Sequence, residues 1–150
     1  MISKLDNKNA LVTAGAQGIG AAITRHLIDQ GANVAIHYFS SADTANELVA
    51  YAESQGRKAV AVSGDLTNEA EATALVQKAS EKLGGLNTLI NNAGSLVGRK
   101  MLCDMESEFW TKVMDINLTS MMYVTKAALP FLSSNESSSI VNLASLAGRK

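Results

Sequence analysis

The sequence has one cysteine, one proline, few aromatic residues and no excess of either charge. Because Cys103 is the only cysteine, no internal disulfide can form, and we expect a protein of a reducing compartment such as the cytoplasm. Its 13 basic and 14 acidic residues give a net charge of −1 without a basic run, which disfavours nucleic acid and anionic membranes as partners. No apolar run approaches the roughly 18 residues of a transmembrane helix, and the N-terminus lacks a signal-peptide core.

The chain also lacks a metal-binding pattern. His26 and His37 share no ligand spacing with each other, with Cys103 or with a carboxylate, so we expect no metal site. We interpret both histidines as surface or packing residues and the cysteine as a small buried hydrophobe. The 150 residues, 47% of them hydrophobic and 18% charged, are enough for one folded domain with a substantial core.

Short apolar segments alternate with longer amphipathic ones along the whole chain. A crossover of ten or more residues between strands implies parallel pairing, so the pattern predicts an α/β fold of three layers, α/β/α, with a doubly wound parallel sheet (a Rossmann fold) over residues 1–150. Expected strands span residues 9–13, 33–38, 58–63, 86–91 and 140–145; expected helices span 18–30, 42–55, 68–83 and 106–132.

Two details of the expected helices follow from residue spacing and type. Ile19, Ile23 and Leu27 recur every four residues and are expected to form the buried face of the first helix. Pro130 is expected to tighten or break the last turn of the long fourth helix.

A glycine-rich segment, Thr13-Ala14-Gly15-Ala16-Gln17-Gly18-Ile19-Gly20, joins the first expected strand to the first helix. A helix N-terminus presents unpaired N–H groups and the positive end of the peptide dipoles, which favours a phosphate. Glycine lets the backbone turn sharply and approach a pyrophosphate. The segment therefore predicts a nucleotide-binding turn at the carboxyl ends of the strands.

Three further patterns follow the later strands. Gly64-Asp65-Leu66 comes after the third strand, and Asn91-Asn92-Ala93-Gly94 ends the fourth. Asn117 lies inside the long helix, where asparagine is unfavourable, and Ser145 ends the fifth strand. Alone, Asp65 would be interpreted as a helix-entry residue and Asn117 as a solvent-facing one.

Together, the four patterns resemble those of the classical short-chain dehydrogenases/reductases, in the same order and spacing. The chain is similar to about the N-terminal three-fifths of such an enzyme, and most similar in appearance to 3-oxoacyl-[acyl-carrier-protein] reductases. The family writes its turn Thr-Gly-x-x-x-Gly-x-Gly; Ala14 replaces the first glycine here, which is tolerable if Ala14 keeps a negative φ.

The resemblance implies a dinucleotide site and two catalytic residues. It implies that Asp65 accepts a hydrogen bond from adenine, and that Asn91 ties the central strands together. Asn117 would interrupt its helix and hold a water of a proton relay, and the Ser145 hydroxyl would donate to the substrate oxygen. The implied coenzyme-binding residues are Thr13, Gly15, Gln17, Gly18, Ile19, Gly20, Tyr38, Ser40, Ser41, Asp65, Leu66, Asn91, Ala93 and Gly94.

The end of the second strand favours NADP over NAD. A carboxylate there would bind the ribose 2′-hydroxyl and repel a 2′-phosphate, whereas this chain has Tyr38 followed by Phe39 and the hydroxyls of Ser40 and Ser41. No arginine or lysine stands at Gln17 or just after Tyr38, so NAD stays open as the alternative.

The acid/base pair that the resemblance implies, a tyrosine with a lysine four residues later, would come after Ser145, and the chain ends before it. Tyr38, Tyr51 and Tyr123 have no lysine four residues on, so we interpret them as packing residues. We expect a longer parent chain, because Ile140 to Leu143 would otherwise form an open apolar sheet edge.

The leading hypothesis is thus an oxidoreductase that moves a hydride between NADP(H) and a small carbonyl or alcohol, 3-oxoacyl thioesters included, in a homo-oligomeric parent (tetramer or dimer). The alternatives are a nucleotide-binding fragment without catalysis and a methyltransferase-like Rossmann protein, which binding of adenosyl-methionine would reveal. The substrate itself is not encoded in any of these patterns.

Overall fold

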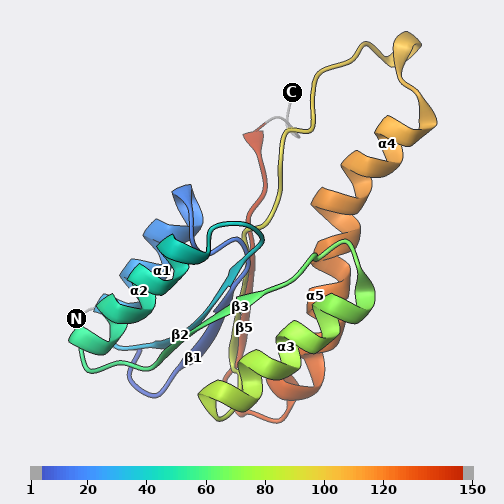
Figure 1. Ribbon diagram of the computed structural model, residues 1–150. Coiled ribbons are helices and arrows are strands. Elements are labelled where there is room, and N and C mark those ends of the chain that lie inside the picture. Colours follow the sequence, from blue (N-terminus) through green and yellow to red (C-terminus); the bar gives the residue numbers. More distant parts are fainter. Residues whose placement is uncertain (1–4, 147–150) are drawn as a thin grey trace.

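A five-stranded parallel sheet forms the centre of the molecule in the computed structural model, which describes residues 5–146 (Figure 1). The strand order is β3-β2-β1-β4-β5, and every neighbouring pair is parallel. This order confirms the doubly wound topology, with the chain reversing its direction of growth between β1 and β4. The strands are β1 (Asn9–Val12), β2 (Asn33–Tyr38), β3 (Ala59–Ser63), β4 (Thr88–Asn91) and β5 (Ser139–Asn142).

Helices cover both faces of the sheet and make the molecule three layers thick. Figure 1 shows α1 (Gly18–Asp29) and α2 (Ala42–Ser54) on one side, and α3 (Glu69–Leu83) and α5 (Ser120–Ser133) on the other. A short 3-10 turn, η1 (Leu102–Asp104), precedes α4 (Ser107–Met114), which extends beyond the sheet. The expectation of a buried cysteine is wrong, because Cys103 lies in η1, where no residue is buried, and is exposed. A π-helical turn, η2 (Asp115–Thr119), joins α4 to α5 without a break.

Each face of the sheet has its own hydrophobic core. Side chains alternate between faces along a strand, so Leu11 packs with α3 and α5 while its neighbour Val12 packs with α1 and α2. Both residues are fully buried, as are Val34 and Ile36 of β2. The continuously apolar central strands of the sequence are thus explained by burial on two sides.

The buried face of α1 differs from the expected one by one residue. Gly20, Thr24 and Ile28 face the core, whereas Ile19 is 68% exposed. A Cβ at Gly20 would collide with the carbonyl oxygen of Ala14, so the helix packs closely against the turn after β1 through this glycine. This close approach turns the helix so that Ile19 lies outside, which hydrophobic spacing alone did not predict.

The long fourth helix continues through Pro130 for its last turn, so of the two expected outcomes, a tightened or a broken last turn, the break does not occur. Pro130 lies inside α5, which ends at Ser133. Proline has no N–H, so the carbonyl of Lys126 loses its helical partner, but this part of the helix is exposed and water can hydrate that oxygen. The exposed setting is the physical reason why the helix is not broken here.

The strand β5 lies at the edge of the sheet with little cover. Ile140 is 39% exposed, Val141 47% and Leu143 37%. The predicted open apolar edge is therefore confirmed for the described part of the chain. Over residues 5–146, none of the helices combines the length and the apolar character that crossing a membrane requires.

Candidate functional site

The turn between β1 and α1 is built around two residues in the left-handed region. Gly18 has a φ of 49°, and Ala14 has a φ of 48°. The condition that Ala14 keeps a negative φ is therefore wrong: alanine occupies the position where the family has glycine, and in the strained conformation that glycine tolerates. Gly15 instead is a packing glycine, because a Cβ there would lie 2.9 Å from the Val12 carbonyl oxygen.

The first turn of α1 leaves backbone donors unused at its exposed tip. Gln17 precedes the helix in an extended conformation and makes no side-chain cap. Within residues 5–146, the N–H groups of Gly18 and Ile19 donate no hydrogen bond. A Cβ at Gly18 would meet no atom within 4 Å, so this side of the turn is open. The helix N-terminus is thus available to an anion.

Thr13 and Asn92 fasten the turn to the end of β4. The Thr13 hydroxyl oxygen accepts from the backbone N–H groups of Asn92 and Ala93, both at 2.9 Å. In return, the Asn92 side-chain amide donates to the carbonyl oxygens of Thr13 at 3.0 Å and Ala14 at 3.2 Å. Thr13 was expected at the site, but Asn92 was missed, since a polar residue after a strand does not disclose its partner.

His37 is a second residue whose position the sequence did not disclose. It is 3% exposed, and its ring bridges two loops: Nδ1 lies 2.9 Å from the Ala14 nitrogen, and Nε2 lies 3.0 Å from the Gly64 carbonyl oxygen. Its own carbonyl oxygen accepts from the Gly15 N–H at 2.8 Å. Burial lowers the pKa of the imidazole, while the bond to Gly64 and the charge of Asp65 act in the opposite direction.

A cavity of about 790 Å³ opens at the carboxyl ends of the first four strands. Ala14 lines it from the glycine turn, His37 and Phe39 from the end of β2, and α4 closes the opposite wall. Four residues expected at the site also line it: Asp65, Leu66, Ala93 and Gly94. The size suits a drug-sized or nucleotide ligand.

The wall beyond β3 is shaped by Asp65. Its Oδ1 accepts from the Thr67 N–H at 2.9 Å and from the Thr67 hydroxyl at 2.7 Å, and its own N–H donates to Glu71 at 2.8 Å. The cap of α3 is Asn68 and not Asp65, so Asp65 sets the turn before the helix entry. Leu66, 7% exposed, provides an apolar surface beside it.

The end of β2 carries the aromatic and hydroxyl side chains expected there. Tyr38 is half-buried and packs against the α1–α2 core, whereas Phe39 is 72% exposed and lines the cavity. Ser41 precedes α2 but makes no side-chain cap. Neither Ser40 nor Ser41 forms a side-chain hydrogen bond within residues 5–146, so both hydroxyls are available.

Asn91 lies in the sheet and does not line the large cavity. Its Nδ2 donates to the Thr125 hydroxyl at 3.0 Å and to Asn142 Oδ1 at 2.8 Å, which joins β4 to α5 and β5. Its buried Oδ1 has no partner among the described residues. The expected role of tying strands together agrees with these bonds.

The two residues expected to be catalytic lie on different elements. Asn117 is in the π-turn η2, so the expected interruption of the helix is present. Its Oδ1 accepts from the Ser95 N–H at 2.9 Å, and its Nδ2 donates to the carbonyl oxygens of Ser95 and Val113, each at 3.0 Å. Ser145 is exposed and follows β5 at the same edge of the sheet as the other loops.

The comparisons with known proteins agree with this geometry. A sequence model described as short chain dehydrogenase matches residues 8–150. The 3-oxoacyl-[acyl-carrier-protein] reductase FabG of Staphylococcus aureus is 31% identical over 141 residues, which are 94% of this chain and 57% of that protein.

Two solved structures are similar over nearly the whole chain. A short chain dehydrogenase from Burkholderia cenocepacia in complex with NADP gives a TM-score of 0.90 at 35% identity, over 98% of this chain and 59% of that one. The NADH-dependent reductase A1-R′ complexed with NAD gives a TM-score of 0.91 at 32% identity, over 99% of this chain and 63% of that one. The chain spans about half the length of the curated relatives it matches.

Proposed function

The chain belongs to the short-chain dehydrogenase family, and from that premise we propose that it forms the coenzyme-binding part of an NADP(H)-dependent oxidoreductase. The proposal rests above all on the first turn of α1. There the N–H groups of Gly18 and Ile19 are unpaired within residues 5–146, and a Cβ at Gly18 would meet nothing within 4 Å. An anionic diphosphate fits this position because it accepts hydrogen bonds and stabilises the positive end of the helix.

The cavity, which the glycine turn borders through Ala14 and not through Gly18 or Ile19, fits the other parts of a dinucleotide. Leu66 offers an apolar surface for a base, and Asp65 beside it offers a carboxylate that can accept from an amino group. A Cβ at Gly94 would lie 2.9 Å from Asn117 Oδ1, so the loop after β4 presents bare backbone to the cavity. Thr13 holds the Ala93 N–H of this loop.

When bound, NADP(H) supplies or accepts the hydride that interconverts a carbonyl and an alcohol. We propose that the Ser145 hydroxyl donates to the substrate oxygen as negative charge develops on it. Both side-chain N–H groups of Asn117 already donate to Ser95 and Val113, and its Oδ1 accepts from Ser95. We propose that a water of a proton relay held at η2 donates to a backbone carbonyl oxygen of that turn. The side chain then serves to fix the turn.

The preference for NADP over NAD is proposed from the end of β2. Tyr38 places no carboxylate where a ribose hydroxyl would be bound, and the hydroxyls of Ser40 and Ser41 are available to a 2′-phosphate. Similar structures hold NADP in one case and NAD in another, so NAD is the competing coenzyme to be tested.

Fluorescence titration of the protein with NADPH and NADH tests the coenzyme site directly. We expect both to bind and NADPH to bind more tightly, and we expect Ile19→Asp to abolish both, because its carboxylate would stand in front of the unpaired donors. Ala22→Asp is the matched control: it adds the same charge to an exposed position of α1 about one turn further along. Equal binding by Ile19→Asp and Ala22→Asp would contradict the proposed site.

The finer substrate class, 3-oxoacyl thioesters, is proposed from the likeness to the FabG reductase. The test is the loss of NADPH absorbance when the protein as its gene encodes it is mixed with a 3-oxoacyl thioester, a simple ketone or an aldehyde. Ser145→Ala is expected to lower kcat by about 100-fold or more while leaving the Kd for NADPH unchanged. Coenzyme binding without turnover of any carbonyl would favour the alternative, a binding fragment without catalysis.

A further inference from the structure

We propose that His37 is a positioning residue of the coenzyme site, and that its neutral imidazole holds the glycine turn in the shape that binds coenzyme. The inference rests on the proposed function, since it concerns the same site. It adds a residue and a pH dependence that the glycine pattern does not contain.

The ring bridges two loops that line the cavity, the turn after β1 and the loop after β3. Nδ1 accepts from the Ala14 N–H at 2.9 Å, which requires an unprotonated nitrogen. The hydrogen of the neutral ring is then on Nε2, where it donates to the Gly64 carbonyl oxygen at 3.0 Å. These two bonds determine the tautomer of the ring, and through them the side chain holds the turn after β1 and the start of the loop after β3 in place.

The bond to Ala14 falls on a strained residue. Ala14 is left-handed, a conformation that alanine adopts at a cost of about 1–2 kcal/mol. The His37 ring accepts a hydrogen bond from the N–H of Ala14, and the His37 carbonyl oxygen accepts one from the N–H of Gly15. A single residue thus binds two consecutive amides of the turn. The amides that remain unpaired, at Gly18 and Ile19, are aimed by the turn that these bonds hold.

Protonation of His37 opposes this arrangement. An imidazolium carries N–H on both nitrogens, so Nδ1–H would face the Ala14 N–H and the bond would be lost. Burial lowers the His37 pKa below its ordinary 6.5, so the ring is neutral at neutral pH and its protonation in acid competes with the native turn.

Few charged groups surround the ring. Residues 9–24 of β1, the turn and early α1 contain none, nor do residues 59–64 of β3 and the loop after it. Asp65 acts on the ring directly, and Glu71 of α3 binds the Asp65 N–H. The charged groups on the far wall of the cavity are Glu108, Lys112 and Asp115.

Two substitutions separate the hydrogen bond from the charge. In His37→Asn, the amide oxygen takes the place of Nδ1 and accepts from Ala14, but it does not titrate. In His37→Leu, the ring volume is largely kept and the acceptor is lost. Asp65 and Glu71 are present in both variants, so any pH dependence that they cause remains.

Calorimetric titration with NAD⁺ from about pH 5 to about pH 8 measures the effect. For the wild-type protein, we expect the Kd to rise with falling pH, approaching about tenfold per pH unit below the His37 pKa. We expect His37→Asn to bind within about threefold of wild type at pH 8 with a flat profile, and His37→Leu to bind at least about tenfold more weakly at every pH. NAD⁺ is used because the 2′-phosphate of NADP⁺ titrates in the same range.

The outcomes are distinct. A profile in His37→Asn as steep as that of the wild type overturns the inference, and so does wild-type affinity in His37→Leu. Absence of binding by the wild type to both NAD⁺ and NADP⁺ at every pH refutes the proposed function itself. Urea unfolding of each variant at pH 8 shows whether a weakened variant is folded; if His37→Leu is unfolded, the comparison of wild type with His37→Asn decides.

Discussion

Ala14 is a left-handed alanine in a turn where glycine carries no strain, with a φ of 48°. Ala14→Gly is expected to stabilise the protein by about 1 kcal/mol, because relief of the strain outweighs the greater flexibility of glycine in the unfolded chain. Urea unfolding followed by circular dichroism measures this change.

Ala16 provides the control for that substitution. It lies two residues further along the same turn, is 1% exposed and does not have a positive φ. Ala16→Gly is expected to destabilise the protein by about 1 kcal/mol, since it removes a buried methyl group and adds flexibility. A destabilised Ala14→Gly variant would show that the methyl group of Ala14 contributes more through its packing than its backbone loses through strain.

The Thr13 hydroxyl is the acceptor of two consecutive amides, those of Asn92 and Ala93, in a site where Thr13 is 1% exposed. Thr13→Val keeps the shape but leaves both donors without this acceptor, so we expect a loss of about 2 kcal/mol or more in the free energy of unfolding. Thr13→Ser keeps the acceptor and removes only a methyl group, with an expected loss of about 1 kcal/mol. If urea unfolding gave the same loss of free energy of unfolding for Thr13→Val and Thr13→Ser, the hydroxyl would not be what holds the turn to the end of β4.

For single residues, the sequence predicted the positions of residues in the turn better than their hydrogen-bond partners. The glycines and Thr13 stand where the spacing indicated, because a strand, a turn and a helix follow each other locally. His37 and Asn92 were missed because their partners lie 23 and 78 residues away, and such contacts depend on the strand order. The sign of φ at Ala14 was also inaccessible, since it results from the bonds that hold the turn.

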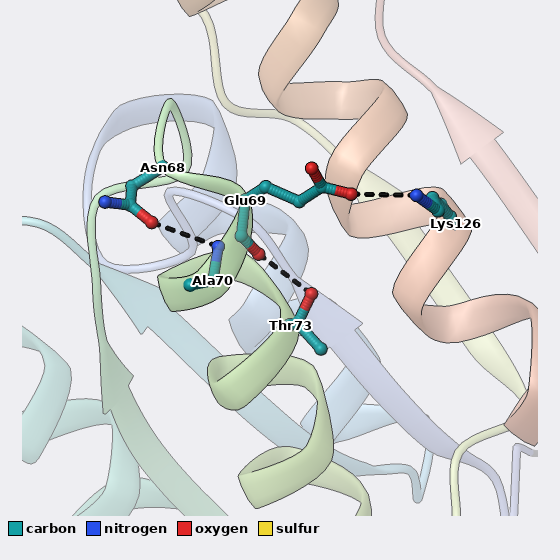
Figure 2. A network of polar contacts seen from close by, with 5 residues as sticks. All are labelled: Asn68, Glu69, Ala70, Thr73 and Lys126. Carbon is teal, nitrogen blue, oxygen red and sulfur yellow. Dashed lines mark hydrogen bonds and ion pairs between the residues drawn. The ribbon is translucent and has the colours of Figure 1, made fainter.

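Among the elements, the N-terminus of α3 allows the stabilising effects of a helix cap and of a surface ion pair to be compared, because it has both a capping residue and an ion pair to α5. Figure 2 shows both: the Asn68 side chain accepts from the N–H of Ala70, and Glu69 pairs with Lys126 at 2.8 Å. The Asn68 oxygen also accepts from the Glu71 N–H at 3.2 Å, so two first-turn donors depend on it. The pKa of Lys126 is raised by its bond to Glu69, yet its side chain is 69% exposed and solvated.

We therefore expect Asn68→Ala to lower the free energy of unfolding by about 1 kcal/mol. Lys126→Met removes the ion pair and is expected to leave the urea midpoint unchanged, because water and salt screen the exposed charges. A larger shift of the midpoint for Lys126→Met than for Asn68→Ala would reverse this ranking.

The boundaries of most elements were predictable, and the reasons are local. Helices α1, α2 and α3 stop at glycines with positive φ, Gly31, Gly56 and Gly84, which the sequence displays. Two features other than boundaries were not predictable: the buried face of α1, which is set by the contact of Gly20 with the Ala14 carbonyl, and the unbroken course of α5 through Pro130. Both depend on what surrounds the helix: a neighbouring backbone in one case and solvent in the other.

For the whole molecule, stability is expected to fall from the centre of the sheet to β5. Leu11 and Val12 of β1 are fully buried, whereas Ile140 and Val141 of β5 are 39% and 47% exposed. Amide hydrogen exchange followed by NMR is expected to be slowest in β1 and β2 and fastest among the strands in β5, since few buried contacts oppose local opening there. Protection of β5 equal to that of β1 would contradict the expectation.

The architecture as a whole followed from the alternation of apolar segments with helical ones, because crossover length alone dictates parallel pairing. The position of the cavity at the carboxyl ends of the strands followed from the glycine turn. The shape of the cavity did not follow from the sequence, because its far wall is formed by α4, and no local sequence pattern determines how far α4 lies from Asp65.

The strand order has a consequence for how the chain is made. Among the five strands of residues 5–146, β1 is synthesised before the others and lies in the middle, and β2, β3, β4 and β5 each attach to a margin that already exists. None has to insert between two earlier strands, so a nascent chain leaving the ribosome can assemble outward in the order of translation.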